Sequence, residues 1–152
     1  MKYLSDSVES TIDLGQKIGR RLKGGEFVAL IGDLGGGKTH FTKGIAKGLG
    51  IEGEITSPTF VIERIYRSPK GLFLHHFDFY RLGSFDQEIK ADITDLLKDK
   101  KNIVIVEWAE NIPEVIPNKG LQIDFEYKND QNREIILTPF GEKYKSLIEG
   151  LA

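Results

Sequence analysis

The feature that most constrains this chain is a glycine-rich run in its first third, Gly32-Asp-Leu-Gly-Gly-Gly-Lys-Thr39. The run matches the pattern G-x-x-x-x-G-K-[ST] at every fixed position. The mostly apolar segment Glu26–Ile31 before it predicts a buried strand, and Lys38–Leu49 after it predicts a helix that ends at Gly50. A glycine loop between a strand and a helix is typical of phosphate binding, so the sequence predicts a nucleotide-binding α/β protein.

Each residue type in this loop has a physical reason. Glycines permit positive φ angles and bring the backbone close to the phosphates, so that successive N–H groups point at the negative charge. Lys38 supplies a mobile positive charge for the outer phosphates, and Thr39 offers its hydroxyl to Mg²⁺. The residues predicted to contact the nucleotide are Asp33, Leu34, Gly35, Gly36, Gly37, Lys38, Thr39 and His40.

A magnesium nucleotide site also needs an acidic residue, and two candidates follow predicted strands. Glu107 comes directly after the buried strand Asn102–Val106, and Asp78 lies near the end of the predicted strand Leu72–Tyr80. Either carboxylate would hold Mg²⁺ or orient the attacking water. The alternative for each is an ordinary ion pair at the end of a strand. The residues alone leave both roles open.

The remaining sequence alternates between helical and strand patterns. Leu121–Tyr127 alternates apolar and polar residues, which predicts an outer strand in a hairpin with Arg133–Thr138. We expect one domain over residues 1–152, a three-layer α/β fold in which helices flank a central mixed sheet, part parallel and part antiparallel. The other predicted elements are a helix over Ser7–Leu22, strands over Val61–Arg67 and Leu72–Tyr80, a helix from a capping box at Ser84 and Gln87 to Lys98, and a helix over Gly141–Leu151.

Composition narrows the classes of function. The chain has 21 basic and 23 acidic side chains, a net charge of -2, so it lacks the basic excess of a dedicated nucleic-acid binder. The absence of cysteine excludes disulfides and thiolate metal sites. The N-terminal residues do not form a signal-peptide pattern, and the apolar run Phe27–Ile31 is too short to cross a bilayer. We therefore expect a cytoplasmic protein with no membrane partner.

The loop does not reveal which base is bound. Asn118-Lys119-Gly120-Leu121 begins like the guanine-reading Asn-Lys-x-Asp motif of GTPases. Leu121 replaces the aspartate and cannot accept hydrogen bonds from guanine, so we predict a turn there.

Four blocks of the chain, taken in order and with their spacing, resemble the bacterial TsaE family. This family is the ATPase subunit of the machinery that makes threonylcarbamoyladenosine in tRNA. The match covers nearly the whole chain, although Gly36 replaces the alanine that is common in the family. The blocks are Gly32–Thr39, Ser57-Pro-Thr-Phe60, His76-x-Asp78-x-Tyr80-Arg81-Leu82 and Glu107-Trp108-x-Glu110.

The resemblance implies Mg²⁺-dependent ATP hydrolysis, weak in the isolated chain and dependent on the partner proteins TsaB and TsaD, with tRNA reached indirectly through that complex. It also implies that Thr39 and Glu107 belong to the magnesium site, that Asp78 is an active-site acid, and that Ser57–Phe60 is a switch loop. Two alternatives remain: a small-molecule kinase on the same fold, and a module that binds a nucleotide without hydrolysing it.

Further side chains near these blocks have competing interpretations. His76 would orient water or a phosphate, but a histidine in a strand is more often structural. Tyr80 and Trp108 would stack on the base, but we favour packing in the core or against a partner. Arg81 would serve as an internal arginine finger, although a surface ion pair is the more ordinary role.

Overall fold

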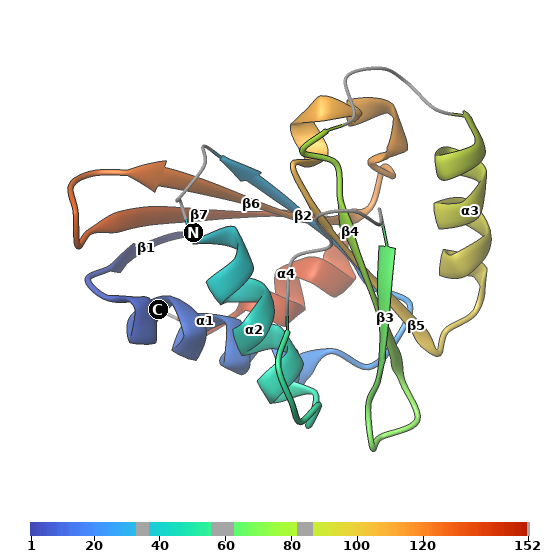
Figure 1. The fold of residues 1–152 in the computed structure, drawn as a ribbon, viewed down its shortest axis with the longest axis horizontal. Coiled ribbons are helices and arrows are strands. Elements are labelled where there is room, and N and C mark those ends of the chain that lie inside the picture. Colours follow the sequence, from blue (N-terminus) through green and yellow to red (C-terminus); the bar gives the residue numbers. More distant parts are fainter. Residues whose placement is uncertain (33–36, 56–62, 82–86, 152) are drawn as a thin grey trace.

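The structure is a computed structural model that describes residues 1–32, 37–55, 63–81 and 87–151 (Figure 1). Asp33, Leu34, Gly35 and Gly36 lie outside the described residues, and so do the predicted loop Ser57–Phe60 and the capping-box residue Ser84. Within the described ranges, seven strands form one sheet in the order β1-β7-β6-β2-β5-β4-β3. They are β1 (Lys2–Ser5), β2 (Phe27–Gly32), β3 (Glu63–Arg67), β4 (Phe73–Asp78), β5 (Asn102–Glu107), β6 (Gly120–Tyr127) and β7 (Arg133–Phe140).

The middle of the sheet is parallel and its two sides are antiparallel. Strand β2 runs parallel to both β5 and β6, and β4 runs parallel to β5. Strand β7 is antiparallel to β6 and to β1, and β3 is antiparallel to β4. The carboxyl ends of β2, β4 and β5 therefore meet at one edge of the sheet, which is where an open α/β sheet places its ligands.

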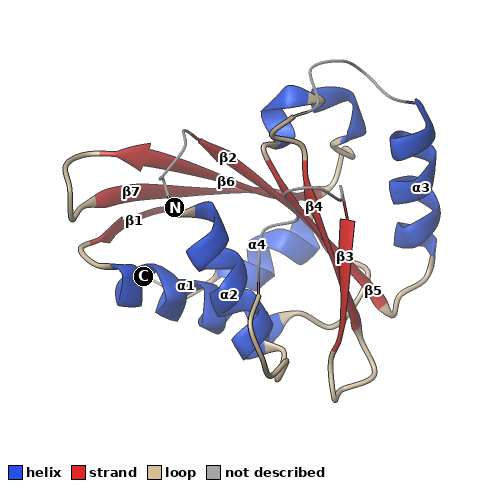
Figure 2. Ribbon diagram, viewed as in Figure 1, coloured by secondary structure: helices blue, strands red, loops and turns tan. Residues whose placement is uncertain are grey.

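Helices cover both faces of this sheet (Figure 2). One face packs against α1 (Val8–Arg21), α2 (Lys38–Gly48) and α4 (Glu142–Ile148), and the other against α3 (Gln87–Lys98) and the 3₁₀ turns η1 (Ala109–Asn111) and η2 (Pro113–Val115). Alternate residues of a strand serve opposite cores, because Val28 packs toward α1 and α2 while Phe27 packs toward α3. The predicted three-layer fold with a mixed sheet is confirmed.

The structure corrects the sequence-based description of the sheet in two places. Strand β6 is not an outer strand, because it lies between β2 and β7. The alternation of apolar and polar residues in β6 indicates that one face of the strand is more buried than the other. Edge strands and interior strands can both show this pattern, so it does not give the position of a strand in the sheet. Strand β1 was not predicted, since it has only four residues and Leu4 within it is exposed.

Glycines fix the position of α2 against α1. A Cβ atom added to Gly19 would lie 2.3 Å from the carbonyl oxygen of Ile45, and one added to Gly48 would lie 2.4 Å from that of Gln16. Gly15 and Gly44 are enclosed in the same way, because an added Cβ atom would lie 2.4 Å and 2.2 Å, respectively, from a carbonyl oxygen of the facing helix. The two helices thus touch through their backbones, so the helix that follows the glycine loop is held in one place.

Among the described residues, every helix is too short or too polar to cross a bilayer.

Candidate nucleotide and magnesium site

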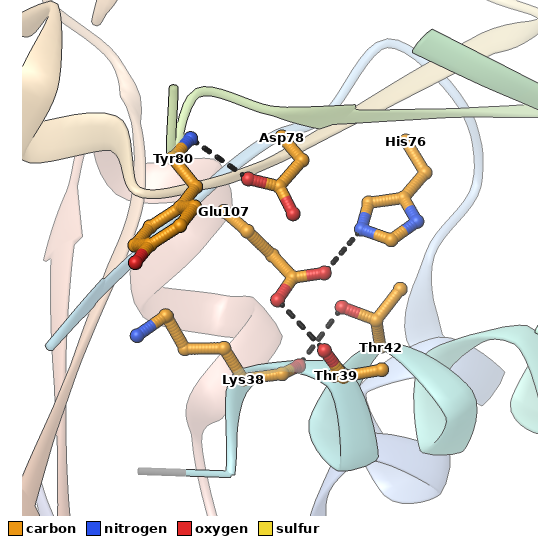
Figure 3. A network of polar contacts seen from close by, with 7 residues as sticks. All are labelled: Lys38, Thr39, Thr42, His76, Asp78, Tyr80 and Glu107. Carbon is orange, nitrogen blue, oxygen red and sulfur yellow. Dashed lines mark hydrogen bonds and ion pairs between the residues drawn. The ribbon is translucent and has the colours of Figure 1, made fainter. Parts of the chain in front are cut away.

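The predicted site residues that the structure describes come together at the carboxyl edge of the parallel strands. Gly32 ends β2, Asp78 ends β4 and Glu107 ends β5, while Lys38 and Thr39 form the start of α2. Asp78 and Glu107 are direct neighbours in the β4–β5 register, and Glu107 is paired with Leu30 of β2 on its other side. Residues separated by the whole middle of the chain therefore share one small region (Figure 3).

Gly37 shapes the entry into α2. It is the N-cap residue, and its φ of 103° lies in the left-handed region that glycine adopts without strain. The first N–H groups of a helix have no acceptor within the helix, and the helix dipole is positive at this end. The start of α2 is therefore suited to an anion.

Lys38 is buried, with 5% of its surface exposed, and its Nζ atom donates a hydrogen bond to the carbonyl oxygen of Gly32. The same atom lies 4.0 Å from the ring centroid of Trp108, whose ring is 5.0 Å from that of Tyr80. An ammonium group over an indole ring is a favourable cation–π contact. Trp108 packs at the margin of the core beneath α3, and sequence reasoning missed its contact with Lys38.

The backbone at Trp108 is strained. Its φ of 58° is left-handed, a conformation that costs a non-glycine residue about 1–2 kcal/mol. The turn follows β5 at once and aims the indole ring back toward Lys38. Strain next to a strand end that carries Glu107 is the kind of feature that clusters at functional sites.

Glu107 is the buried centre of a polar chain of three residues (Figure 3). Its carboxylate is almost inaccessible, with 2% of the residue exposed. Oε1 accepts a hydrogen bond of 3.0 Å from Oγ1 of Thr39, and Oε2 lies 2.5 Å from Nε2 of His76. Thr42 lies one turn after Lys38, and its hydroxyl donates a hydrogen bond of 3.0 Å to the carbonyl oxygen of Lys38.

Asp78 has a different environment from Glu107. It is half-buried, and its Oδ1 atom accepts a hydrogen bond of 2.8 Å from the backbone N–H of Tyr80. This contact holds the turn that leaves β4, and the carboxylate stays on the same side of the sheet as His76 and Glu107. Asp78 is thus beside the site but more accessible than Glu107.

Glu110 was not assigned a role from sequence. Its Oε2 atom accepts a hydrogen bond of 2.9 Å from the backbone N–H of Gly32, at the start of the glycine loop. A Cβ atom on Gly32 would lie 2.5 Å from the carbonyl oxygen of Phe125, so only glycine fits there. The only signal for Glu110 in the sequence was its place in the Glu107-Trp108-x-Glu110 block.

His40 connects the start of α2 with a neighbouring cavity. Burial lowers the pKa of His40 below its usual 6.5, the nearby Lys43 ammonium lowers it further, and Glu9 opposes both. The imidazole is therefore mainly neutral at pH 7. The cavity has a volume of about 410 Å³, and its lining includes Gly37, His40, Thr11, Asp130 and Arg133.

The donor set suits magnesium that arrives with phosphates. Within the described ranges, histidine and acidic side chains do not gather in groups of three or more that would hold a metal by themselves. Mg²⁺ is bound in proteins by one or two oxygen side chains, with phosphate oxygens and water completing its shell. The Thr39 hydroxyl and the Glu107 carboxylate meet that requirement, and Asp78 lies close by.

Comparisons with known proteins show the family of this chain. Residues 5–135 match the family model described as "Threonylcarbamoyl adenosine biosynthesis protein TsaE". The chain is 36% identical to the TsaE protein of Bacillus subtilis over 152 residues, which is 100% of this chain and 94% of that protein. It is 37% identical to TsaE of Treponema pallidum over 135 residues, covering 89% and 98% of the two chains.

A solved structure has the same fold as this chain. The crystal structure of YdiB from Bacillus subtilis superposes with a TM-score of 0.80 and 34% identity, covering 99% of this chain and 93% of that one. The family model covers most of the chain, and the similarity to relatives extends over nearly all of it. The chain therefore belongs to the TsaE family, as the four sequence blocks led us to expect.

Proposed function

We propose that this chain binds ATP with Mg²⁺ and hydrolyses it as part of threonylcarbamoyladenosine formation in tRNA. The observation that carries the proposal is the 3.0 Å hydrogen bond between Thr39 and Glu107, formed next to a complete phosphate-loop pattern. A hydroxyl can give its proton to a carboxylate while its oxygen lone pairs bind a cation. Thr39 would thus hold Mg²⁺ directly, with Glu107 behind it.

Lys38, Glu107 and Asp78 would each have a part in this chemistry. Lys38 would leave the Gly32 carbonyl and bind the β- and γ-phosphates, which offer a stronger acceptor for its charge. Glu107 would hold Thr39 and orient water near the metal, and the more accessible Asp78 would act as a second active-site acid. When bound, Mg²⁺ would neutralise negative charge on the phosphate oxygens.

The nucleoside would lie in the cavity beside the start of α2. Gly37 and His40 line the cavity of about 410 Å³, so it lies directly beside the first turn of α2. Its size is within the range of small-molecule sites. The backbone N–H groups predicted to hold the phosphates belong to residues 33–40, and those of Gly37, Lys38, Thr39 and His40 lie where α2 begins.

The partners TsaB and TsaD belong to the same proposal. The support is membership of a family named for threonylcarbamoyladenosine biosynthesis, whose product is a modified tRNA base. We expect the chain to reach tRNA through these partners, because its own charge is slightly negative. Hydrolysis would be slow in the isolated chain and faster in the assembled complex.

The test is ATP turnover by the purified chain, with and without TsaB and TsaD, for the native protein and for Lys38→Ala. We expect turnover to rise with the partners and to be abolished by the substitution. Equal turnover with and without partners would contradict the dependence on TsaB and TsaD. A single-turnover measurement separates hydrolysis from simple binding, because bound ATP that never becomes ADP would make the chain a nucleotide-gated module instead.

A further inference from the structure

His76 lies directly behind Glu107, deep inside the protein. It is on β4, two residues before Asp78 and therefore on the same face of the sheet, and 0% of it is exposed. Its Nε2 atom lies 2.5 Å from Oε2 of Glu107. Its other ring nitrogen, Nδ1, is buried and has no hydrogen-bond partner among the residues that the structure describes.

These contacts determine where the ring carries its proton. The Glu107 carboxylate accepts from Thr39 on one oxygen, so the short contact to the other oxygen requires a donor, which is Nε2–H. A hydrogen on Nδ1 would be a buried donor with no acceptor among the described residues, which is costly. The arrangement therefore places a hydrogen on Nε2, directed at the Glu107 carboxylate.

We propose that His76 is a positioning residue that fixes the Glu107 carboxylate so that Oε1 faces Thr39. The inference rests on the proposed function, in which Glu107 supports the magnesium ligand. A glutamate side chain has three rotatable bonds, and hydrogen bonds to both of its oxygens select one orientation. Such supporting contacts typically change metal affinity about 10–100-fold when they are removed.

The adjacent residue provides a matched control. His75 points to the opposite face of β4, where Nδ1 lies 2.8 Å from Oε2 of Glu63 and Nε2 lies 3.0 Å from Oδ1 of Asn102. It is also largely buried, with 6% exposed. The two histidines share a strand and a similar degree of burial, but only His76 contacts Glu107.

The first measurement uses the native chain without nucleotide. Nitrogen-15 NMR of the protein labelled at histidine reports the protonation of each ring nitrogen. We expect His76 to carry a hydrogen on Nε2, the ring nitrogen that faces Glu107. An Nε2 atom without hydrogen would overturn the proposal, and this result does not depend on any variant folding or on any activity.

The second measurement is the Mg²⁺ concentration at which ATP binding, followed by calorimetry, is half-maximal. His76→Leu removes the donor and should raise this concentration about 10-fold or more. His76→Gln keeps an N–H donor at a similar reach and should stay within about 3-fold of the native value. His75→Gln should match the native protein.

Glu107→Ala separates the role of His76 from the proposed function of the site. If Glu107→Ala raises the Mg²⁺ concentration for half-maximal ATP binding and His76→Leu does not, the role of His76 is overturned while the proposed function stands. If neither variant changes this concentration, the assignment of Glu107 fails and the role of His76 fails with it. A loss in His76→Leu that His76→Gln does not restore would indicate a packing role and would also contradict the proposal.

Discussion

Oγ1 of Thr39 lies 3.0 Å from Oε1 of Glu107, and this hydrogen bond joins the first turn of α2 to the end of β5. The two residues are 68 positions apart in the chain. Each is placed by a different part of the fold, Thr39 by the helix that follows the glycine loop and Glu107 by a strand paired on both sides. The contact forms only when α2 and the parallel sheet are both in place.

Glu107→Gln should separate catalysis from binding. The substitution keeps the size of the side chain but removes its charge, so it should lower ATP turnover by about 10²-fold or more. At saturating Mg²⁺, the dissociation constant for ATP should change little, because Lys38 and the loop backbone make the main contacts with the phosphates. Steady-state turnover and calorimetry test the two effects, with the exposed Glu114→Gln as control. Unchanged turnover in Glu107→Gln would show that this residue was wrongly assigned.

Nucleotide binding should change the fluorescence of Trp108, the only tryptophan in the chain. The Lys38 ammonium lies 4.0 Å from the indole ring, and we expect it to move to the phosphates when ATP binds. Titration with Mg²⁺ and ATP should therefore shift the emission. Lys38→Ala should alter the starting emission, remove most of the affinity for triphosphate and abolish the shift. The idea fails if calorimetry detects ATP binding to the native chain while the emission stays constant.

Gly19→Ala should destabilise the whole fold. The added Cβ would lie 2.3 Å from the Ile45 carbonyl oxygen, so α1 and α2 would have to separate. Overpacking of this kind costs roughly 1–3 kcal/mol or more. Denaturant unfolding measures the loss, and Lys17→Ala, on the exposed side of α1, should change the free energy of unfolding by no more than about 0.5 kcal/mol. Equal stability of the two variants would mean that the helices are not packed through their backbones.

Tyr144→Phe should lower stability by an amount that depends on pH. The Tyr144 hydroxyl accepts a hydrogen bond of 3.0 Å from the buried N–H of Phe27, at the start of β2. Leaving that N–H without this acceptor costs about 1–3 kcal/mol. Denaturant unfolding near pH 8 should show the difference between the native protein and the variant.

The pKa of Tyr144 determines how this difference in stability changes at alkaline pH. Burial raises the pKa of Tyr144 above its usual 10.0, the charge of Glu26 acts in the same direction, and the Phe27 hydrogen bond opposes them. The folded state therefore holds this proton more tightly than the unfolded state. The stability that comes from Tyr144 is complete below pH 10 and is lost as the pH rises through the raised value. Native protein and Tyr144→Phe should converge in stability above pH 10, and a constant gap would contradict the pKa shift.

The sequence by itself determined the local parts of this protein. The spacing of Gly37, Lys38 and Thr39 after a buried strand predicted the glycine loop and its helix, and the strand before Glu107 predicted an acid at a strand end. The periodicity of the apolar residues predicted most helices and strands, because a helix or a strand buries one face at a fixed repeat. The four blocks together identified the family.

The tertiary structure decided which of these parts meet. Pairing of β5 with both β2 and β4 places Glu107 beside Asp78, and the packing of α2 on the sheet brings Thr39 to it. The contacts of His76 with Glu107 and of Lys38 with Trp108 were missed, as was the interior position of β6. Periodicity records which face of a segment is buried, but strand order and the partners of a side chain depend on segments far away in the chain, which no local pattern specifies.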